Sequence, residues 1–411
     1  MTRDHRIFAA ASAVLALHVL DDSFLQPQPG TSAVDHLAGG LVPTALVLGA
    51  VWAYPRLRAG ARAALALLLG AFGVVLSIEA LHYTREVGPS GDDYTGLAAL
   101  PAGLSLLALG VVTLWRSRKL DRLRRRYPRR ALLAVVALAA TVLVVFPLSL
   151  AYAVTHTARA EVAPADLGVT PEEISFTTSD GLRLEGWFVP SRNGATVIAF
   201  PGRTNPQAHA RMLIRHGYGV LLFDRRGEGA SDGDPNLFGW DGDRDVHAAV
   251  DYLRSRPDVD PDRIGAIGLS VGGEMLLEAA AESDALKAVV SEGASARSVR
   301  DDWANPGGAD KIGQVMLGAG ITVGTALFSN GTPPETLERY AARIAPRAVY
   351  FVYAQTVPGE QEPNESFYAA AGAPKGIWAV PSGGHMDAVE AHPAEYERRV
   401  VGFLDEALLR P

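Results

Sequence analysis

The sequence predicts two parts of different kinds: an N-terminal α-helical transmembrane bundle and a C-terminal α/β domain. Residues 1–157 hold long apolar runs and few acids, whereas residues 165–411 have the composition of an ordinary soluble domain. From residue 172 onward, short β-rich runs alternate with amphipathic helical patterns, which is typical of a mostly parallel sheet with helices on both faces. The polar, proline-containing stretch 158–171 is the expected linker, so the domains are 1–157 and 172–411.

Four apolar runs are each long enough to form a helix that crosses about 30 Å of hydrocarbon. They are His36–Tyr54, Ala63–Tyr83, Tyr94–Trp115 and Ala131–Thr155. A fifth run, Ile7–Leu20, is shorter and also fits the apolar core of a signal peptide, but no cleavage site of small residues follows it. We therefore expect about five spans.

Basic residues collect in alternate connections between these runs. They lie before Ile7–Leu20, between His36–Tyr54 and Ala63–Tyr83, and at 116–130. By the positive-inside rule, these connections and the N-terminus are cytoplasmic. Five spans then place the α/β domain outside the cytoplasm. The expected location is a multi-pass position in the cell membrane, with membrane lipids as partners.

The composition excludes several classes of protein. The net charge of −7 over 411 residues gives no reason to expect nucleic-acid binding. The chain has no cysteine, which excludes a disulfide framework, a thiolate metal site and a cysteine nucleophile. No metal or cofactor is expected.

A serine between glycines is the most distinctive motif of the second part. Gly268-Leu-Ser270-Val-Gly272 lies between the apolar strand Ile264–Ile267 and a helical run. Side chains at the glycine positions would collide with the neighbouring strand and helix, so glycine suits a strained turn that exposes the serine hydroxyl. The helix start also offers the backbone N–H of Val271 and the positive end of the helix dipole to a developing negative charge. The motif indicates a nucleophilic serine.

A serine hydroxyl is a poor nucleophile unless a base and an orienting carboxylate assist it. His385, in the loop Ser-Gly-Gly-His-Met-Asp before the C-terminal helix, is a candidate for the base. The rival His392 lies next to a proline at the start of that helix and is expected to be a surface residue.

Residues 172–411 resemble the α/β-hydrolases and are similar to the dienelactone-hydrolase and serine-aminopeptidase-like branches. The resemblance rests on four segments in the family's order: Phe200–Arg203, Leu222–Ser231, Gly268–Gly272 and Gly383–His385. It implies the α/β-hydrolase fold, with the histidine of the triad last in the chain, after the final strand, and His385 in that place as the expected base. It also implies an oxyanion hole made by the backbone N–H groups of Val271 and Arg203.

The carboxylate of the implied triad is ambiguous. The resemblance places it just after the strand Ala348–Tyr353, where relatives carry an aspartate and this chain has none. Glu362 is the first choice and Glu360 a close second. Glu292, at the end of the preceding strand, is a third candidate.

An insertion at about 295–347 is expected to form a small lid over the pocket, as in relatives. Its apolar run, Ile312–Phe328, contains several glycines, which argues against a sixth span. A span there would also place Ser270 and His385 on opposite sides of the membrane.

The expected function is that of a membrane-anchored serine hydrolase that cleaves an ester, thioester or small amide through an acyl-enzyme. Its expected substrate is a small-molecule or lipid-like acyl compound. Two alternatives stay open: acyl transfer to a lipid or envelope acceptor, and a non-catalytic receptor or scaffold with a hydrolase fold.

Overall fold

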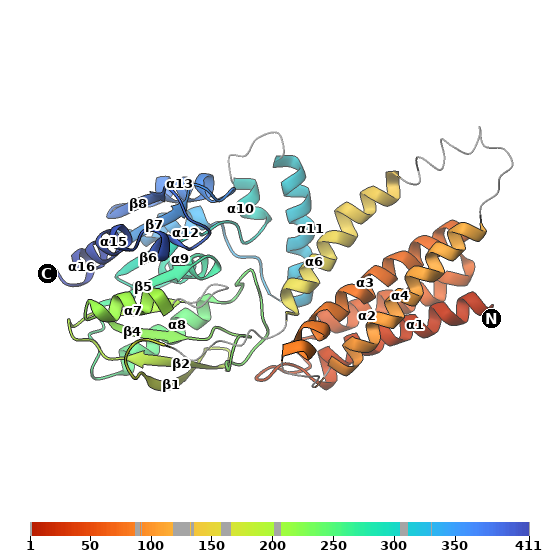
Figure 1. The fold of residues 1–411 in the computed structure, drawn as a ribbon, viewed down its shortest axis with the longest axis horizontal. Helices are drawn as coiled ribbons and strands as arrows, with labels where there is room; N and C mark the ends of the chain where they lie inside the picture. The colour runs from red at the N-terminus through yellow and green to blue at the C-terminus, as the bar shows by residue number, and fades with distance from the viewer. Residues whose placement is uncertain are drawn as a thin grey trace. The chain divides into compact units, whose positions relative to one another are not determined.

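The computed structural model describes residues 2–86, 91, 93–117, 132, 135–157, 166–200, 207–304, 311–329 and 331–410 (Figure 1). The chain divides into two compact units. The helical unit comprises Met1–Ala158 and Met316–Gly331, and the α/β unit comprises Arg159–Val315 and Thr332–Pro411.

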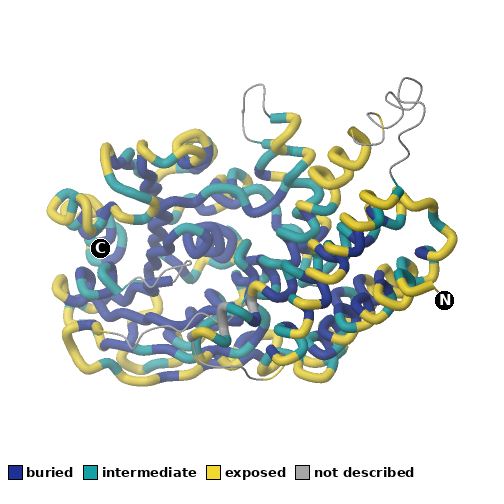
Figure 2. Tube along the Cα trace, turned by 45° about the vertical axis from the view of Figure 1, so that its right-hand side comes forward, coloured by how far each residue is buried: buried dark blue, intermediate teal, exposed yellow. Residues whose placement is uncertain are grey.

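The helical unit is built from long apolar helices. Its helices are α1 (Arg3–Leu20), α2 (Leu37–Ala53), α3 (Ala59–Glu86), α4 (Asp93–Arg116), α6 (Phe146–Thr155) and most of α11 (Lys311–Ser329). Small residues let α3 and α4 approach closely, because a Cβ at Gly70 would lie 2.8 Å from the Gly103 carbonyl oxygen. Large apolar side chains such as Leu46 and Trp115 are each at least 65% exposed. Figure 2 shows that exposed positions recur along the helices of this unit.

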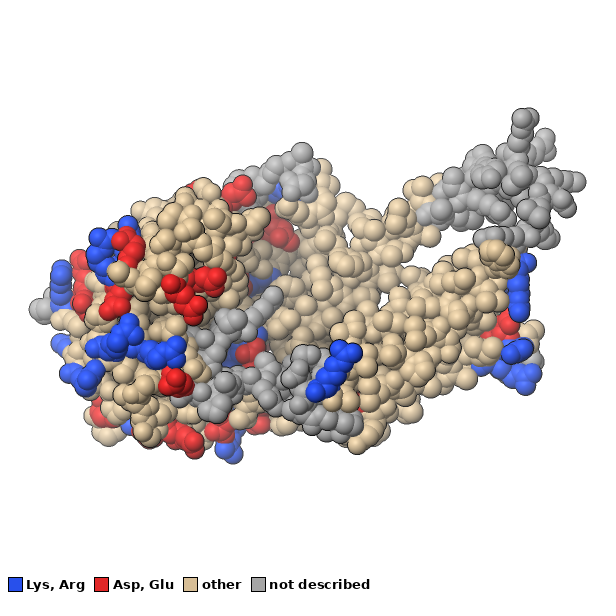
Figure 3. All heavy atoms as spheres, in the orientation of Figure 1, with Lys and Arg blue, Asp and Glu red and all other residues tan. Residues whose placement is uncertain are grey.

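Six helical segments among the described residues are long and apolar enough to cross a membrane. They are Arg3–Leu25, Leu37–Arg56, Ala59–Ile78, Asp93–Arg116, Val135–Thr155 and Lys311–Ser329. The charged side chains visible on these helices gather at their ends and leave their long sides uncharged (Figure 3). The first segment is longer than the apolar run Ile7–Leu20 suggests, because a π-helical turn (Asp21–Leu25) extends α1.

The α/β unit contains one eight-stranded sheet with the order β1-β2-β4-β3-β5-β6-β7-β8. The strands are β1 (Glu172–Thr177), β2 (Arg183–Val189), β3 (Thr196–Phe200), β4 (Gly219–Phe223), β5 (Ile264–Leu269), β6 (Ala288–Glu292), β7 (Ala348–Ala354) and β8 (Lys375–Val380). β2 pairs antiparallel with both β1 and β4, and every other pair is parallel. The mostly parallel sheet confirms the predicted fold class.

Helices cover both faces of this sheet. One apolar core contains buried residues of α8 (Asp243–Ser255), α9 (Val271–Glu282), α12 (Leu337–Ile344) and α13 (Gln361–Ala370). The core on the other face contains residues of α7 (Gln207–Arg215), α14 (Ala388–Ala391), α15 (Pro393–Tyr396), the π-helical turn Glu397–Val401 and α16 (Gly402–Leu408). Strands β3 to β7 are buried along their whole length, as expected for parallel strands between two helical layers.

The insertion expected to form one lid is divided between the two units. Its short helix α10 (Val299–Ala304) and α12 belong to the α/β unit, whereas Met316–Gly331 belongs to the helical unit. The glycines of the apolar run do not prevent a long helix, because α11 is unbroken over 19 residues. Two of these glycines pack closely against α6, and that contact offsets their unfavourable backbone entropy.

Candidate active site

Ser270 occupies a strained turn between β5 and α9. Its backbone has φ 51° and ψ −124°, a conformation that is costly for a residue with a side chain. The turn is tight, since a Cβ at Gly268 would lie only 2.5 Å from the Gly272 carbonyl oxygen. A Cβ at Gly273 would lie 2.6 Å from the Ser291 hydroxyl, so this third glycine, which the motif did not single out, is needed as well.

His385 lies within hydrogen-bond distance of this serine. Its Nε2 is 2.9 Å from Ser270 Oγ, although 115 residues separate the two in sequence. The ring packs over Gly293, where a Cβ would lie 2.9 Å from Cε1. No sequence pattern identified Gly293, but its φ of +71° also favours glycine. The rival His392 is half-buried and is instead hydrogen-bonded to Ser382.

Glu360, the second of the three carboxylate candidates, is the one that contacts His385. Its Oε1 is hydrogen-bonded to Nδ1 of the ring, and its Oε2 accepts from the Ala354 N–H at 2.8 Å. The structure therefore brings Glu360, and not the first choice Glu362, to the ring. The chain turns sharply at Gly359, with φ +86°, which buries Glu360 under the end of β7. Glu362 lies in the first turn of α13 and is exposed.

The third candidate, Glu292, is buried at the end of β6 and has other partners. Its Oε2 accepts a hydrogen bond from the Tyr396 hydroxyl at 2.7 Å and lies 3.3 Å from His209 Nε2. Its backbone carbonyl accepts from the Ser270 N–H at 2.7 Å. The Glu292 backbone therefore holds the start of the serine turn in place, and Glu360 is the carboxylate that contacts the His385 ring.

Nearby carboxylates favour the charged form of His385. The hydrogen bond that the ring Nδ1–H donates to Glu360 raises the pKa of His385 above its usual value, whereas partial burial acts in the opposite direction. The charges of Glu274 and Glu292 raise the pKa further. Such a site stabilises an imidazolium at the moment when it receives a proton.

Val271 is the first residue of α9, so its N–H points out of the helix start beside Ser270. No residue in the described ranges accepts a hydrogen bond from it. The other expected oxyanion donor, Arg203, lies outside the described residues.

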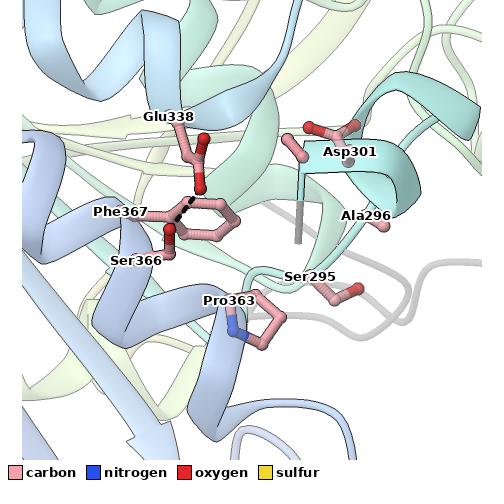
Figure 4. A pocket seen from close by; sticks show the side chains of 8 residues that line it. Ser295, Ala296, Asp301, Glu338, Pro363, Ser366 and Phe367 are labelled. Carbon is pink, nitrogen blue, oxygen red and sulfur yellow. Dashed lines mark hydrogen bonds between the residues drawn. The ribbon is translucent and has the colours of Figure 1, made fainter. Parts of the chain in front are cut away.

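A narrow cavity lies beside the Glu360 loop, between α10, α12 and α13 (Figure 4). It encloses about 10 Å³, which is room for about one water molecule. The hydrogen bond between Ser366 and Glu338 runs along its wall. A cavity of this size cannot accept an acyl substrate.

One group of described side chains could hold a metal ion. Asp243, His247 and Glu282 present ligand atoms within 4.8 Å of one another. Burial, followed by the charges of neighbouring glutamates, raises the pKa of Asp243 to about 6. Glu282 ends α9, and a helix rises about 1.5 Å per residue, so the group is roughly 18 Å from Ser270. It is therefore no part of the arrangement around the serine.

Comparison with known proteins identifies the family of the α/β unit. Residues 168–386 match the X-Pro dipeptidyl-peptidase (S15) family. The chain belongs to this family. Membership confirms the predicted relation to the α/β-hydrolase superfamily of serine hydrolases, and the protein is a hydrolase of the esterase or peptidase type.

Individual proteins are also similar to part of this chain. The Escherichia coli K12 protein YfhR is 30% identical over 251 residues, which cover 58% of this chain and 81% of YfhR. The Penicillium polyketide transferase GrgF is 35% identical over 127 residues, which cover 29% of this chain and 43% of GrgF. The solved structure of the Pyrococcus furiosus esterase Pf2001 shares the fold, with a TM-score of 0.50, 22% identity, and coverage of 62% of this chain and 99% of that one.

Proposed function

We propose that the protein is a membrane-anchored serine hydrolase that cleaves an ester, thioester or small amide through an acyl-enzyme. The observation that carries the proposal is the continuous contact from Ser270 through His385 to the buried Glu360. This is the nucleophile, base and orienting acid that acyl transfer to a serine requires.

In the first step, His385 Nε2 takes the proton of Ser270 while Oγ bonds to the acyl carbon. The carbonyl oxygen gains a negative charge, which the Val271 N–H and the start of α9 stabilise, and we expect the Arg203 N–H to be the second donor. When the tetrahedral intermediate collapses, the imidazolium gives its proton to the leaving alcohol, thiol or amine. The product of this step is an acyl ester of Ser270.

Water then hydrolyses the acyl-enzyme, and His385 again transfers the protons. His385 takes a proton from the water as its oxygen attacks the acyl carbon, and it returns that proton to Ser270 as the acid leaves. Glu360 keeps the Nδ1–H in place throughout, so that Nε2 is free to accept a proton. Its negative charge also stabilises the imidazolium in both steps.

The membrane attachment in this proposal rests on the long apolar helices. The basic connections place the N-terminus in the cytoplasm, and five spans place the α/β unit outside it. A multi-pass position beside the lipid favours a lipid-like acyl substrate over a freely soluble one.

Acyl transfer to another acceptor is the second candidate function. The likeness to GrgF, a polyketide transferase, favours it, and the same three side chains would catalyse it. Product analysis with and without added alcohols separates the two, because a transferase gives new esters in proportion to the alcohol. A non-catalytic scaffold is disfavoured, since it has no use for the strained turn at Ser270.

Labelling with a fluorophosphonate probe tests the catalytic proposal. We expect the full-length protein to be labelled and the Ser270→Ala variant to be unlabelled. The exposed Ser255 on α8 provides a control, since Ser255→Ala should be labelled as the parent is. Labelling retained in Ser270→Ala refutes the assignment.

A further inference from the structure

α11 interrupts the sequence of the α/β unit but packs against α6 in the helical unit. A Cβ at Gly320 would lie 2.7 Å from Pro147 Cβ, and one at Gly324 would lie 2.6 Å from Ala151 Cβ. Two small residues four apart allow helices to approach closely inside lipid, where burial of apolar surface does not drive association. One face of α11 is therefore fitted to α6.

The contact continues to the end of the helix. Phe328 lies a further four residues along the same face and packs edge-on against Tyr152, with ring centroids 5.3 Å apart. Its backbone carbonyl oxygen would lie 3.0 Å from a Cβ at Gly39 in α2. The C-terminal half of α11 is thus held by two helices that are themselves long and apolar enough to cross a membrane.

A second stripe on α11 is apolar and uncovered. Ile312, Met316 and Val323 are 75%, 48% and 64% exposed. At about 100° per residue these three positions fall within about 40° of one another, and their mean direction is about 100° from that of Gly320, Gly324 and Phe328. No charged residue occurs from Ile312 to Ser329. A lid in contact with water would carry polar side chains on its outer stripe.

We propose that α11 is embedded in the lipid bilayer, with its glycine stripe on α6 and its Ile312–Met316–Val323 stripe in contact with acyl chains. The partner of this surface is the membrane itself. α11 meets the same criteria of length and apolar composition as the helices around it. Its contact with α6 makes its outer stripe continuous with the lipid-facing surface of the helical unit.

Connectivity restricts how α11 enters the membrane. Ser270 precedes α11 and His385 follows it, yet the two are hydrogen-bonded within one unit. Residues 305–310 alone join α10 to α11, a connection that spans at most about 25 Å. An extended chain cannot cross hydrocarbon, because its backbone groups would be left without hydrogen bonds. α11 therefore enters and leaves the bilayer on the side of the α/β unit, as a partly inserted helix.

Single cysteines test the lipid contact, because the parent chain has none. We would reconstitute the full-length protein in phosphatidylcholine–phosphatidylglycerol vesicles and attach a spin label to Met316→Cys, Val323→Cys or Asp284→Cys. Asp284 is the control, since its side chain is 97% exposed. We expect labels on α11 to relax faster with oxygen than with a water-soluble nickel chelate, and the Asp284 label to show the reverse. Labels on α11 that behave like the control overturn the proposal.

Cysteines near the two ends test the side of entry. A Cβ at Gly313 meets no atom within 4 Å, and Thr332 is exposed, so Gly313→Cys and Thr332→Cys disturb little. A membrane-impermeant maleimide should label both from the side on which Asp284→Cys reacts. Reaction of Gly313→Cys only from the opposite side would mean that α11 crosses the bilayer and would overturn the inference. Neither readout depends on catalytic activity, so both stand apart from the proposed function.

Discussion

Replacement of Glu360 by glutamine gives the sharpest test of the proposed mechanism. In the parent protein the two carboxylate oxygens have separate tasks: Oε1 meets His385 Nδ1 and Oε2 accepts the Ala354 N–H at 2.8 Å. Glutamine has the same size but only one oxygen. If that oxygen keeps the Ala354 hydrogen bond, the side-chain NH₂ faces Nδ1 and forces it to be an acceptor. The proton then sits on Nε2, which can no longer take the proton of Ser270.

The size of this effect follows from the change of tautomer. The comparable change in a serine protease lowers kcat by about 10⁴, which corresponds to about 5.5 kcal/mol in the barrier. Glu360 is only 3% exposed, so water cannot easily replace the lost carboxylate. We therefore expect Glu360→Gln to lose about 10³–10⁴ in kcat for hydrolysis of a p-nitrophenyl ester.

Glu362→Gln is the matched control, because it makes the same chemical change two residues away on the exposed side of α13. Its kcat should stay within about twofold of the parent, as for most surface substitutions. Circular dichroism and thermal unfolding of both variants show whether the fold is intact. A folded Glu360→Gln enzyme within tenfold of the parent would refute the assignment, as would a folded Glu362→Gln enzyme with the larger loss.

Three further predictions concern charge and packing around the serine turn. Glu292→Gln removes a negative charge that raises the pKa of His385, so the acid limb of the kcat/KM profile should move to lower pH; an unmoved limb contradicts this electrostatic role. Gly268→Ala should lower both the unfolding temperature and kcat, because its Cβ would lie 2.5 Å from a backbone oxygen; full activity would show that the turn adapts. Arg297→Met leaves the buried Glu278 without its cation and should cost about 3–5 kcal/mol in the free energy of unfolding, whereas the double variant with Glu278→Gln should recover part of this loss in denaturant titrations.

Local sequence patterns were sufficient for the serine and the histidine. Ser270 lies in a turn whose tight backbone requires glycine nearby, so its chemistry is visible in five consecutive residues. His385 follows the last strand in a short glycine loop, whereas His392 lies next to a proline at the start of the C-terminal helix. The parallel strands could be predicted for the same reason, since buried strands are short, continuous apolar runs.

Long-range packing decides the features that the sequence did not reveal. The pattern of α11 is that of an apolar helix with glycines, and the same pattern suits a lid or a membrane helix. What distinguishes them is the contact of Gly320 and Gly324 with α6, a helix about 170 residues earlier in the chain. No periodicity within α11 encodes that partner. In the sequence alone the glycines argue against a sixth span, because the surface that they fit is not apparent there.

The choice among the three glutamates has the same physical origin. Glu292 ends β6 and Glu360 follows the adjacent parallel strand β7, and parallel strands bring such residues to one edge of the sheet. The Glu292 carboxylate contacts the Tyr396 hydroxyl and the His209 ring, and neither residue is near it in sequence. The turn at Gly359 then brings Glu360 back to the ring, while Glu362 continues into a helix and points outward. Strand order thus identifies the edge where the acid must lie, but the hydrogen bonds made by distant residues determine which carboxylate is left to orient the histidine.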